Sequence, residues 1–287
     1  MDQIKIFIEL TRLKKPIGYM LLFWPCAWGL TTAYDFSRDI NFFLFYLILF
    51  FAGSVLMRSA GCIVNDIVDR KFDRKVSRTK DRPIASGKIS VKKAIFYSIS
   101  LCTLALIVLV QFNHLTILLA IGSMPLAFTY PLMKRFTYWP QLFLGITFNY
   151  GLILGWTSIE SNIDIIPIIF YLGAIFWTLG FDTIYGFQDL KDDEIIGLKS
   201  TSIKFKSKPQ LFLILCYTIF IICLFLLGLL MQFNKFYYLV LAIIGYQLYF
   251  IQIHKLKIDN EKNCLKIFKS NNFLGLLVFI SLIVGKL

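Results

Sequence analysis

Residues 41–73 read NFFLFYLILFFAGSVLMRSAGCIVNDIVDRKFD, an apolar run that ends in an asparagine and three aspartates. The apolar part is longer than the ~20 residues that an α-helix needs to cross about 30 Å of hydrocarbon. The acidic part places carboxylates, which are costly near a bilayer, at the end of that crossing. This stretch therefore predicts a membrane-spanning helix with a polar, functional end.

Apolar runs of similar length recur along the whole chain. Of the 287 residues, 57% are hydrophobic, which is typical of a polytopic membrane protein and not of a soluble domain. We predict one all-α membrane domain over residues 1–287 with nine transmembrane helices, near 16–34, 41–69, 93–112, 114–132, 138–158, 164–188, 210–231, 236–254 and 270–286. Segment 1–15 is too polar to span and has apolar residues at roughly helical spacing, so we expect it to lie along the membrane interface.

The net charge of +13 follows from the predicted topology. With a cytoplasmic N-terminus, nine spans place 26 of the 30 Lys and Arg residues on the cytoplasmic side; the others are Arg38, Arg58, Lys235 and Lys286. This distribution is the positive-inside bias of membrane proteins. It argues against a nucleic-acid partner as the reason for the basic composition. The absence of an Arg- and Ser-rich transit segment favours a bacterial inner membrane over a mitochondrial one.

Cysteine and histidine give little support to a soft-metal or redox site. The six cysteines form no CxxC pair, and five of them fall inside predicted spans, where they are expected to act as small hydrophobic residues. The two histidines, His114 and His254, lie at span ends in unrelated contexts. We therefore expect neither a zinc site nor a histidine-based catalytic site.

The first aspartate series lies on one face of the second predicted span. On a continuous helix, Asp66, Asp69 and Asp73 fall within about 100° of Asn65. Arg58 lies two turns deeper and on the same face. Because an unpaired arginine inside the bilayer is costly, its position predicts a continuous polar cavity along this face.

A second series follows the sixth predicted span, in the stretch DTIYGFQDLKDD at residues 182–193. Asp182, Tyr185, Asp189 and Asp193 fall on a stripe about 80° wide, whereas the neighbouring Asp192 projects off it and is expected to be solvated. Tyr185, Asp189 and Asp193 repeat the spacing of the first series 120 residues later, which is consistent with an internal duplication.

The two series point to one metal site. Both spans run in the same direction, so both stripes emerge at the cytoplasmic surface, and facing carboxylates repel one another unless cations lie between them. Carboxylate and amide oxygens suit Mg²⁺, which typically bridges a few carboxylates to a diphosphate. The residues therefore predict a magnesium and diphosphate site at a membrane face.

The same motifs carry a family resemblance. NDIVDRKFD at 65–73, followed by RTKDRPIASG, resembles the first motif of the UbiA family of intramembrane aromatic prenyltransferases, and DTIYGFQDLKDD resembles the second. The continuation to RTKDRPIASGKIS, the N-terminal RLKKPIGYMLLFWPCAWGL, YPLMK and YWPQLFLG are most similar to members that prenylate 4-hydroxybenzoate in ubiquinone biosynthesis. The resemblance covers about the first 205 residues through motifs, and the last three helices match only in character.

The resemblance implies a nine-helix bundle whose cytoplasmic-side cavity opens laterally to lipid. Mg²⁺ would hold the diphosphate of a polyprenyl donor while the chain passes to the ring carbon ortho to the hydroxyl of a 4-hydroxybenzoate acceptor. The expected metal ligands, aided by Asn65, are Asp66, Asp69, Asp73, Asp189 and Asp193.

The remaining polar residues receive roles by position. Lys134 lies one helical turn after Tyr130 and is expected to bind a diphosphate oxygen, with Arg78 and Arg82 as weaker candidates. Asp182 and Tyr185, deepest in the second series, are expected to face the allylic cation or to accept the ring proton, and both roles stay open. Arg58 is the candidate for the acceptor carboxylate, because a guanidinium grips it through two hydrogen bonds; Arg12 and Arg70 are alternatives.

Two other functions stay open on sequence grounds. One is a member of the same family that uses a naphthoate, homogentisate or haem acceptor, against which the loop motif argues. The other is a cation-coupled transporter. Transporters usually place such acids near the bilayer midplane on broken helices, whereas these stripes run out to one surface.

Overall fold

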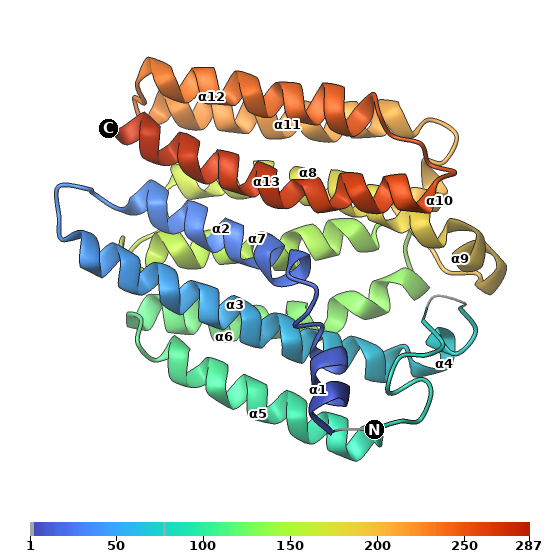
Figure 1. Ribbon diagram of the computed structural model, residues 1–287. Coiled ribbons are helices and arrows are strands. Elements are labelled where there is room, and N and C mark those ends of the chain that lie inside the picture. Colours follow the sequence, from blue (N-terminus) through green and yellow to red (C-terminus); the bar gives the residue numbers. More distant parts are fainter. Residues whose placement is uncertain (1–2, 77–78) are drawn as a thin grey trace.

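The computed structural model describes residues 3–76 and 79–287, and every regular element within these ranges is helical (Figure 1). The long helices are α2 (Ile17–Ala33), α3 (Ile40–Val68), α5 (Val91–Leu109), α6 (His114–Thr129), α7 (Pro140–Thr157), α8 (Ile165–Gly186), α11 (Pro209–Leu230), α12 (Lys235–Tyr246) and α13 (Glu261–Lys286). The π-helix η3 (Gln247–Ile253) continues α12. The short elements are α1 (Gln3–Thr11), α4 (Arg70–Asp73), η1 (Tyr130–Arg135), η2 (Phe187–Asp189), α9 (Leu190–Ile196) and α10 (Thr201–Lys204).

Seven segments within the described ranges are long and apolar enough to cross a membrane. The chain is therefore a multi-pass, all-helical membrane protein. The other two predicted spans correspond to α2 and α7, which have 17 and 18 residues and are not among those seven. Their location in the bilayer stays a prediction.

Most helix ends lie within a few residues of the predicted boundaries, but α13 begins earlier. We expected a span from residue 270, whereas the helix begins at Glu261. The side chain of Asn260 accepts a hydrogen bond from the backbone N–H of Asn263 at 3.0 Å and caps the helix. The first turns are polar, so hydropathy alone does not reveal them.

Helices α2 and α7 pack at very close range. A Cβ atom at Gly29 would overlap the carbonyl oxygen of Leu152, and one at Gly155 would overlap the carbonyl oxygen of Cys26. Small residues allow this backbone approach, which is a usual way to join helices in a membrane. Trp28 of α2 is fully buried, so this helix lies in the core of the bundle and not at its lipid surface.

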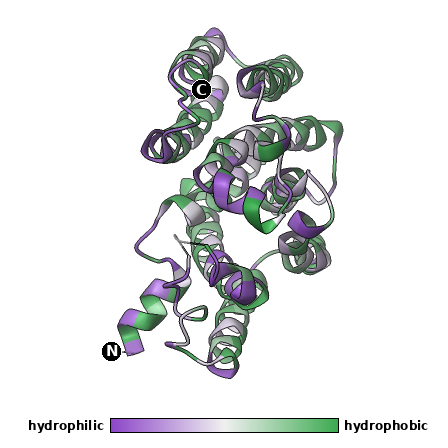
Figure 2. Cartoon of the chain, turned by 90° about the vertical axis from the view of Figure 1, so that its right-hand side faces the viewer, coloured by the Kyte–Doolittle hydropathy of each residue, from purple (hydrophilic) through white to green (hydrophobic). Residues whose placement is uncertain are grey.

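Both aspartate series lie at one end of the bundle. Figure 1 shows α4, α9 and α10 together at the right-hand end, with the C-terminus at the other end. Figure 2 turns that end toward the viewer and shows hydrophilic segments gathered there. The structure thus brings the segments around residues 65–73 and 182–193 to one polar face.

The expected helix in segment 1–15 is α1. Its residues Ile6 and Leu10 are buried, and the ring of Phe7 packs edge-on to Tyr97 of α5 with centroids 5.2 Å apart. Ile4 is exposed on the opposite face. The helix is amphipathic as predicted, and its position at a membrane interface stays a prediction.

Candidate functional site

The first aspartate series crosses the end of a helix. Helix α3 ends at Val68, Asp69 follows as the C-cap residue, and α4 begins at Arg70. The expected single stripe assumed one continuous helix, so this break changes the directions of the side chains. Asp66 and Asp73 share one partner, whereas Asp69 meets a different set of cations.

Two arginines neutralise Asp66 and Asp73. Both carboxylate oxygens of Asp66 accept from Nη2 of Arg12 at 2.8 Å, and Oδ1 also accepts from Nη1 of Arg82 at 3.2 Å. The same Arg82 atom contacts both oxygens of Asp73, at 3.0 and 3.1 Å. Asp66 is only 2% exposed, and a buried carboxylate requires such partners. Arg82 therefore joins the loop after α4 to the end of α3.

Arg12 itself adopts an unusual backbone conformation. Its φ of 59° lies in the left-handed region, which costs a non-glycine residue about 1–2 kcal/mol. Its Nη1 also donates to the carbonyl of Glu9 at 2.8 Å, so the guanidinium connects the end of α1 to Asp66. The ion pair holds the chain turn between α1 and α2 in this strained form.

Asp69 is held by the segment η1. Lys134 donates to Oδ2 of Asp69, and Nη2 of Arg135 lies 3.6 Å from Oδ1. Arg135 also donates to the carbonyl of Val68 at 3.1 Å. Oδ1 of Asp69 is nevertheless buried without a hydrogen-bond partner. This oxygen is a donor atom available to a ligand such as a hard cation.

A second group of predicted residues meets one level deeper. Arg58 of α3 lies within electrostatic reach of Tyr130 of η1 and of Tyr185 of α8. Asp182, one turn before Tyr185, also lies within electrostatic reach of Arg58. All four side chains are half-buried. The structure therefore brings the predicted acceptor residue together with both candidates for the reacting centre.

Two contacts that the sequence did not reveal fix the position of Arg58. Its guanidinium carbon lies 5.3 Å from the ring centroid of Phe148 in α7, a cation–π contact. A Cβ atom at Gly18 of α2 would lie 2.8 Å from Nε of Arg58. Gly18 thus leaves the space that the guanidinium occupies, and its place in the motif RLKKPIGY was the only sequence signal.

The second aspartate series lies on short helical segments. Helix α8 ends at Gly186, Asp189 ends η2, and Asp193 lies in α9. Asp189 and Asp193 are half-buried. Among the residues that the structure describes, no three His, Cys, Asp or Glu side chains lie close enough together to hold a metal ion. The expected five ligands are therefore at one end of the bundle but not gathered in one cluster.

Segment η1 connects the two series. While its side chain pairs with Asp69, the backbone carbonyl of Lys134 accepts from the N–H of Lys199 at 2.9 Å. Lys199 follows α9 and also donates from Nζ to the carbonyl of Phe136 at 3.3 Å. The segment between α6 and α7 thus lies against both loops. Its role as a connection was not predicted.

Three other arginines need separate mention. Arg78 lies outside the described residues. Arg12, an alternative for the acceptor carboxylate, is engaged with Asp66. Arg70, the other alternative, has a buried Nε without a hydrogen-bond partner.

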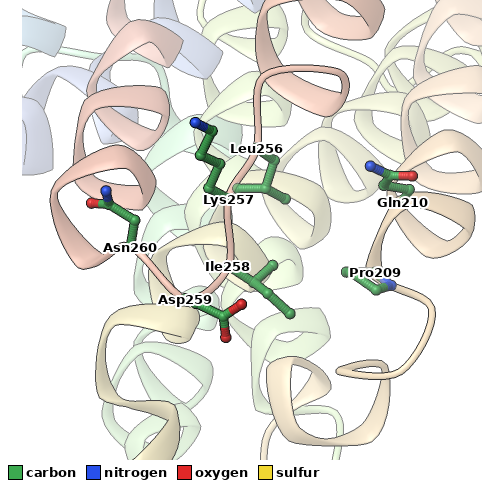
Figure 3. Close-up of a pocket in the computed structure, with 7 residues that line it drawn as sticks. All are labelled: Pro209, Gln210, Leu256, Lys257, Ile258, Asp259 and Asn260. Atoms are coloured by element: carbon green, nitrogen blue, oxygen red, sulfur yellow. The ribbon is translucent and has the colours of Figure 1, made fainter.

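Two further cavities contain none of the predicted site residues. One of about 430 Å³ lies between the start of α11 and the loop before α13, lined by Pro209, Gln210 and residues 256–260 (Figure 3). The other, of about 470 Å³, is apolar and lies between α3, α5 and the end of α6. Its lining includes Val64 and Ile67, which flank Asn65 and Asp66 on α3.

Comparison with known proteins agrees with the motifs and the fold. The family model for the UbiA prenyltransferase family matches residues 22–283. The chain is 42% identical over 282 residues to "4-hydroxybenzoate polyprenyltransferase, mitochondrial" of Bos taurus, covering 98% of this chain and 75% of the relative. It is 38% identical to "4-hydroxybenzoate octaprenyltransferase" of Francisella tularensis subsp. novicida, covering 99% and 98%.

Solved structures show the same fold. A UbiA homolog from Aeropyrum pernix matches with a TM-score of 0.77 and 20% identity, covering 94% of this chain and 99% of the other. A UbiA homolog from Archaeoglobus fulgidus, bound to GPP and Mg²⁺, matches with a TM-score of 0.71 and 18% identity, covering 98% and 99%. The predicted all-helical membrane fold and the family resemblance are confirmed, whereas the count of nine spans stays a prediction, and the chain belongs to the UbiA prenyltransferase family.

Proposed function

We propose that this protein is a 4-hydroxybenzoate polyprenyltransferase that acts in ubiquinone biosynthesis. The observation that carries the proposal is the match to relatives named for this activity, at about 40% identity over nearly the whole chain. The geometry supports it, because Arg58, Tyr130 and Tyr185 lie together at the end of the bundle that carries both aspartate series. The reaction breaks the allylic C–O bond of a polyprenyl diphosphate. A C–C bond then forms ortho to the phenol hydroxyl, and the ring proton is lost.

The polar donor set at this end fits Mg²⁺. The ligands that would hold it are Asp66, Asp69, Asp73, Asp189 and Asp193, with help from Asn65. The buried, hydrogen-bond-free Oδ1 of Asp69 supports this assignment, as does the hard-oxygen chemistry of the set. When bound, Mg²⁺ supplies positive charge that stabilises the departing diphosphate. The solved relative from Archaeoglobus fulgidus is described as bound to GPP and Mg²⁺.

The basic residues around the aspartates bind the diphosphate in this proposal. Lys134 and Arg82 already lie against the first series, at Asp69 and at Asp66 with Asp73. A diphosphate group, which carries several negative charges, needs the same positive charges when it enters beside these carboxylates. Arg78 is also assigned to the diphosphate, from its place in the RTKDRP motif alone.

The acceptor binds deeper, at Arg58. A guanidinium presents paired donors that match a carboxylate, and the cation–π contact with Phe148 holds it in place. In this pose the ring of the acceptor lies near Asp182 and Tyr185. Tyr185 and Asp182 face the allylic cation or receive the ring proton, and Arg58 sets which ring carbon is presented.

We also propose the membrane topology. Nine spans, formed by the seven apolar helical segments together with α2 and α7, place both aspartate series on the cytoplasmic side. The positive-inside distribution of Lys and Arg supports this orientation. A bacterial inner membrane is the compartment that we assign, with the prenyl chain and the apolar helix faces in the bilayer.

One assay tests the function directly. Membranes that contain the protein are incubated with 4-hydroxybenzoate and a polyprenyl diphosphate, with Mg²⁺ or with EDTA. We expect a prenylated 4-hydroxybenzoate only when Mg²⁺ is present. If the protein prenylates a naphthoate or homogentisate but not 4-hydroxybenzoate, the assigned acceptor is wrong. Cation uptake without any prenyl transfer would favour a transporter.

A further inference from the structure

A network of buried polar side chains joins four helices in the second half of the bundle. Nε1 of Trp177 in α8 donates to Oδ1 of Asn271 in α13 at 2.9 Å. The hydroxyl of Tyr217 in α11 donates to Oε1 of Gln252 at 2.6 Å. Nε2 of Gln252 donates to Asn271 and to Gln247, both at 3.0 Å. Trp177, Tyr217, Gln252 and Asn271 are fully buried, so these groups depend on one another for hydrogen bonds.

The π-helix η3 makes this network possible. Gln247 and Gln252 are five residues apart, a spacing that an α-helix would place about 140° apart around its axis. The i to i−5 bond from the N–H of His254 to the carbonyl of Tyr249, 3.0 Å long, shows the wider turn. Rare π-turns of this kind occur often at functional sites. Here the wider turn brings both amide side chains to the same buried cluster.

The network lies one helical turn from the proposed reacting centre. Nδ2 of Asn271 donates back to the carbonyl of Phe268 at 3.2 Å. The Phe268 ring packs on Tyr185, with ring centroids 4.5 Å apart, and also lies 5.8 Å from Phe181. Trp177 and Tyr185 lie on α8, whereas Asn271 and Phe268 lie on α13. The hydrogen bond and the ring contact therefore fix α13 against α8 at two successive levels.

We propose that Asn271, with its network, is a positioning residue for Tyr185. Its hydrogen bonds fix the position of α13 along its axis relative to α8. The position of α13 in turn determines where the Phe268 ring contacts the Tyr185 ring. This inference rests on the proposed function, because it concerns how Tyr185 is presented to the reacting groups. A network that serves only as a connection between helices would affect stability and leave the catalytic step unchanged.

The adjacent residue provides a matched control. Asn272 accepts from Nε1 of Trp24 at 2.9 Å, so it makes the same kind of bond, but from α2 and on another face of α13. The experiment compares Asn271→Leu with Asn272→Leu in the full-length protein. It measures kcat, KM for the polyprenyl diphosphate and for 4-hydroxybenzoate, and thermal unfolding in detergent. We expect Asn271→Leu to lower kcat about tenfold, as misplacement of a reacting group does, with KM for the diphosphate unchanged.

Asn272→Leu is expected to keep wild-type kcat. An unchanged kcat in Asn271→Leu, or an equal loss in both variants, overturns the proposal. If the wild-type protein makes no product from 4-hydroxybenzoate, the proposed function itself fails. If the wild-type protein is active and all variants keep its activity, only the positioning role is overturned.

A second variant keeps the test valid if Asn271→Leu does not fold. Phe268→Leu leaves the hydrogen bonds intact and removes the ring that contacts Tyr185. We expect the same loss of kcat, and the double variant Asn271→Leu/Phe268→Leu is expected to lose no more than either single one. Full kcat in Phe268→Leu, or independent losses that multiply in the double variant, would show that Asn271 does not act through Phe268.

Discussion

The two aspartate series share one end of the bundle but differ in how they are held. In the first, Asp66, Asp69 and Asp73 are 2%, 1% and 6% exposed, and each is paired with Arg or Lys. In the second, Asp189 and Asp193 are half-buried on short helices that follow α8. The ion pair between Lys206 and Glu194 in that region is exposed.

The difference in burial indicates that the two aspartate series have different roles, although their motifs have the same spacing. Buried carboxylates without partners are very costly, so the cations of the first series belong to the fold as well as to the site. Half-buried carboxylates keep contact with water, so their burial costs less. The first series is therefore buried in the fold, and the second lies on short helical segments, one of whose contacts with the first series runs through η1.

The largest expected effect comes from removing one metal ligand of each series. We expect Asp69→Ala and Asp189→Ala each to lower Mg²⁺-dependent prenyl transfer by about 10²–10³-fold or more, because charge stabilisation of the leaving group is lost. Asp69→Ala is expected to lower the unfolding temperature more than Asp189→Ala does, because Asp69 is more deeply buried and its loss leaves Lys134 and Arg135 without their carboxylate. Product formation and thermal unfolding in detergent measure the two effects.

Asp192→Ala is the control, because Asp192 lies in α9, next to the expected ligand Asp193, but was expected from the sequence to project off the stripe. It is expected to keep nearly full activity. Full activity in Asp69→Ala or Asp189→Ala would remove that residue from the metal site. Equal losses of stability in both would contradict the difference in burial.

The sequence predicted the elements and the end at which they gather, but not how the acids are paired. Long apolar runs identify the spans because bilayer thickness fixes their length. The prediction that the acids of the first series share one face assumed one continuous helix through Asp73, whereas the helix breaks at Asp69. A local pattern contains no information on that break, because it depends on tertiary partners.

Those partners come from distant positions. Arg12 is 54 residues from Asp66, and Lys134 is 65 residues from Asp69. Lys134 was predicted to bind diphosphate through its spacing from Tyr130, and the structure adds a contact with Asp69 that spacing does not reveal. Arg58 was predicted to face a polar cavity, because a buried arginine in a membrane has few alternatives, and the structure places it within electrostatic reach of Tyr185.

An intermediate effect on stability is expected from the ion pairs themselves. Arg12→Ala leaves Arg82 as the cation paired with the buried carboxylate of Asp66 within the described residues, and we expect it to lower the free energy of unfolding by about 3 kcal/mol. Lys206→Ala breaks an exposed pair, and it is expected to cost less than about 1 kcal/mol. Denaturant unfolding in detergent measures both. Similar costs would contradict the larger contribution expected from the buried pair.

Arg58 lies where the two regions meet, since it extends from α3 toward Asp182 and Tyr185 of α8. We expect Arg58→Ala to raise KM for 4-hydroxybenzoate by about 10–100-fold, the usual cost of losing hydrogen bonds to a charged group. KM for the polyprenyl diphosphate is expected to change far less. An equal rise in both KM values would remove Arg58 from the acceptor site.

A smaller displacement of the same side chain gives the finest test. In Gly18→Ala the new Cβ would lie 2.8 Å from Nε of Arg58, so the guanidinium must shift while its charge stays. We expect KM for 4-hydroxybenzoate to rise roughly threefold through this misplacement, with KM for the diphosphate unchanged. Gly61→Ala is the control, because Gly61 lies on the same helix as Arg58 and a Cβ there meets no atom within 4 Å. If Gly18→Ala leaves KM for 4-hydroxybenzoate unchanged while Arg58→Ala raises it, the acceptor needs the charge of Arg58 but not its exact position, and α2 then has no part in acceptor selection.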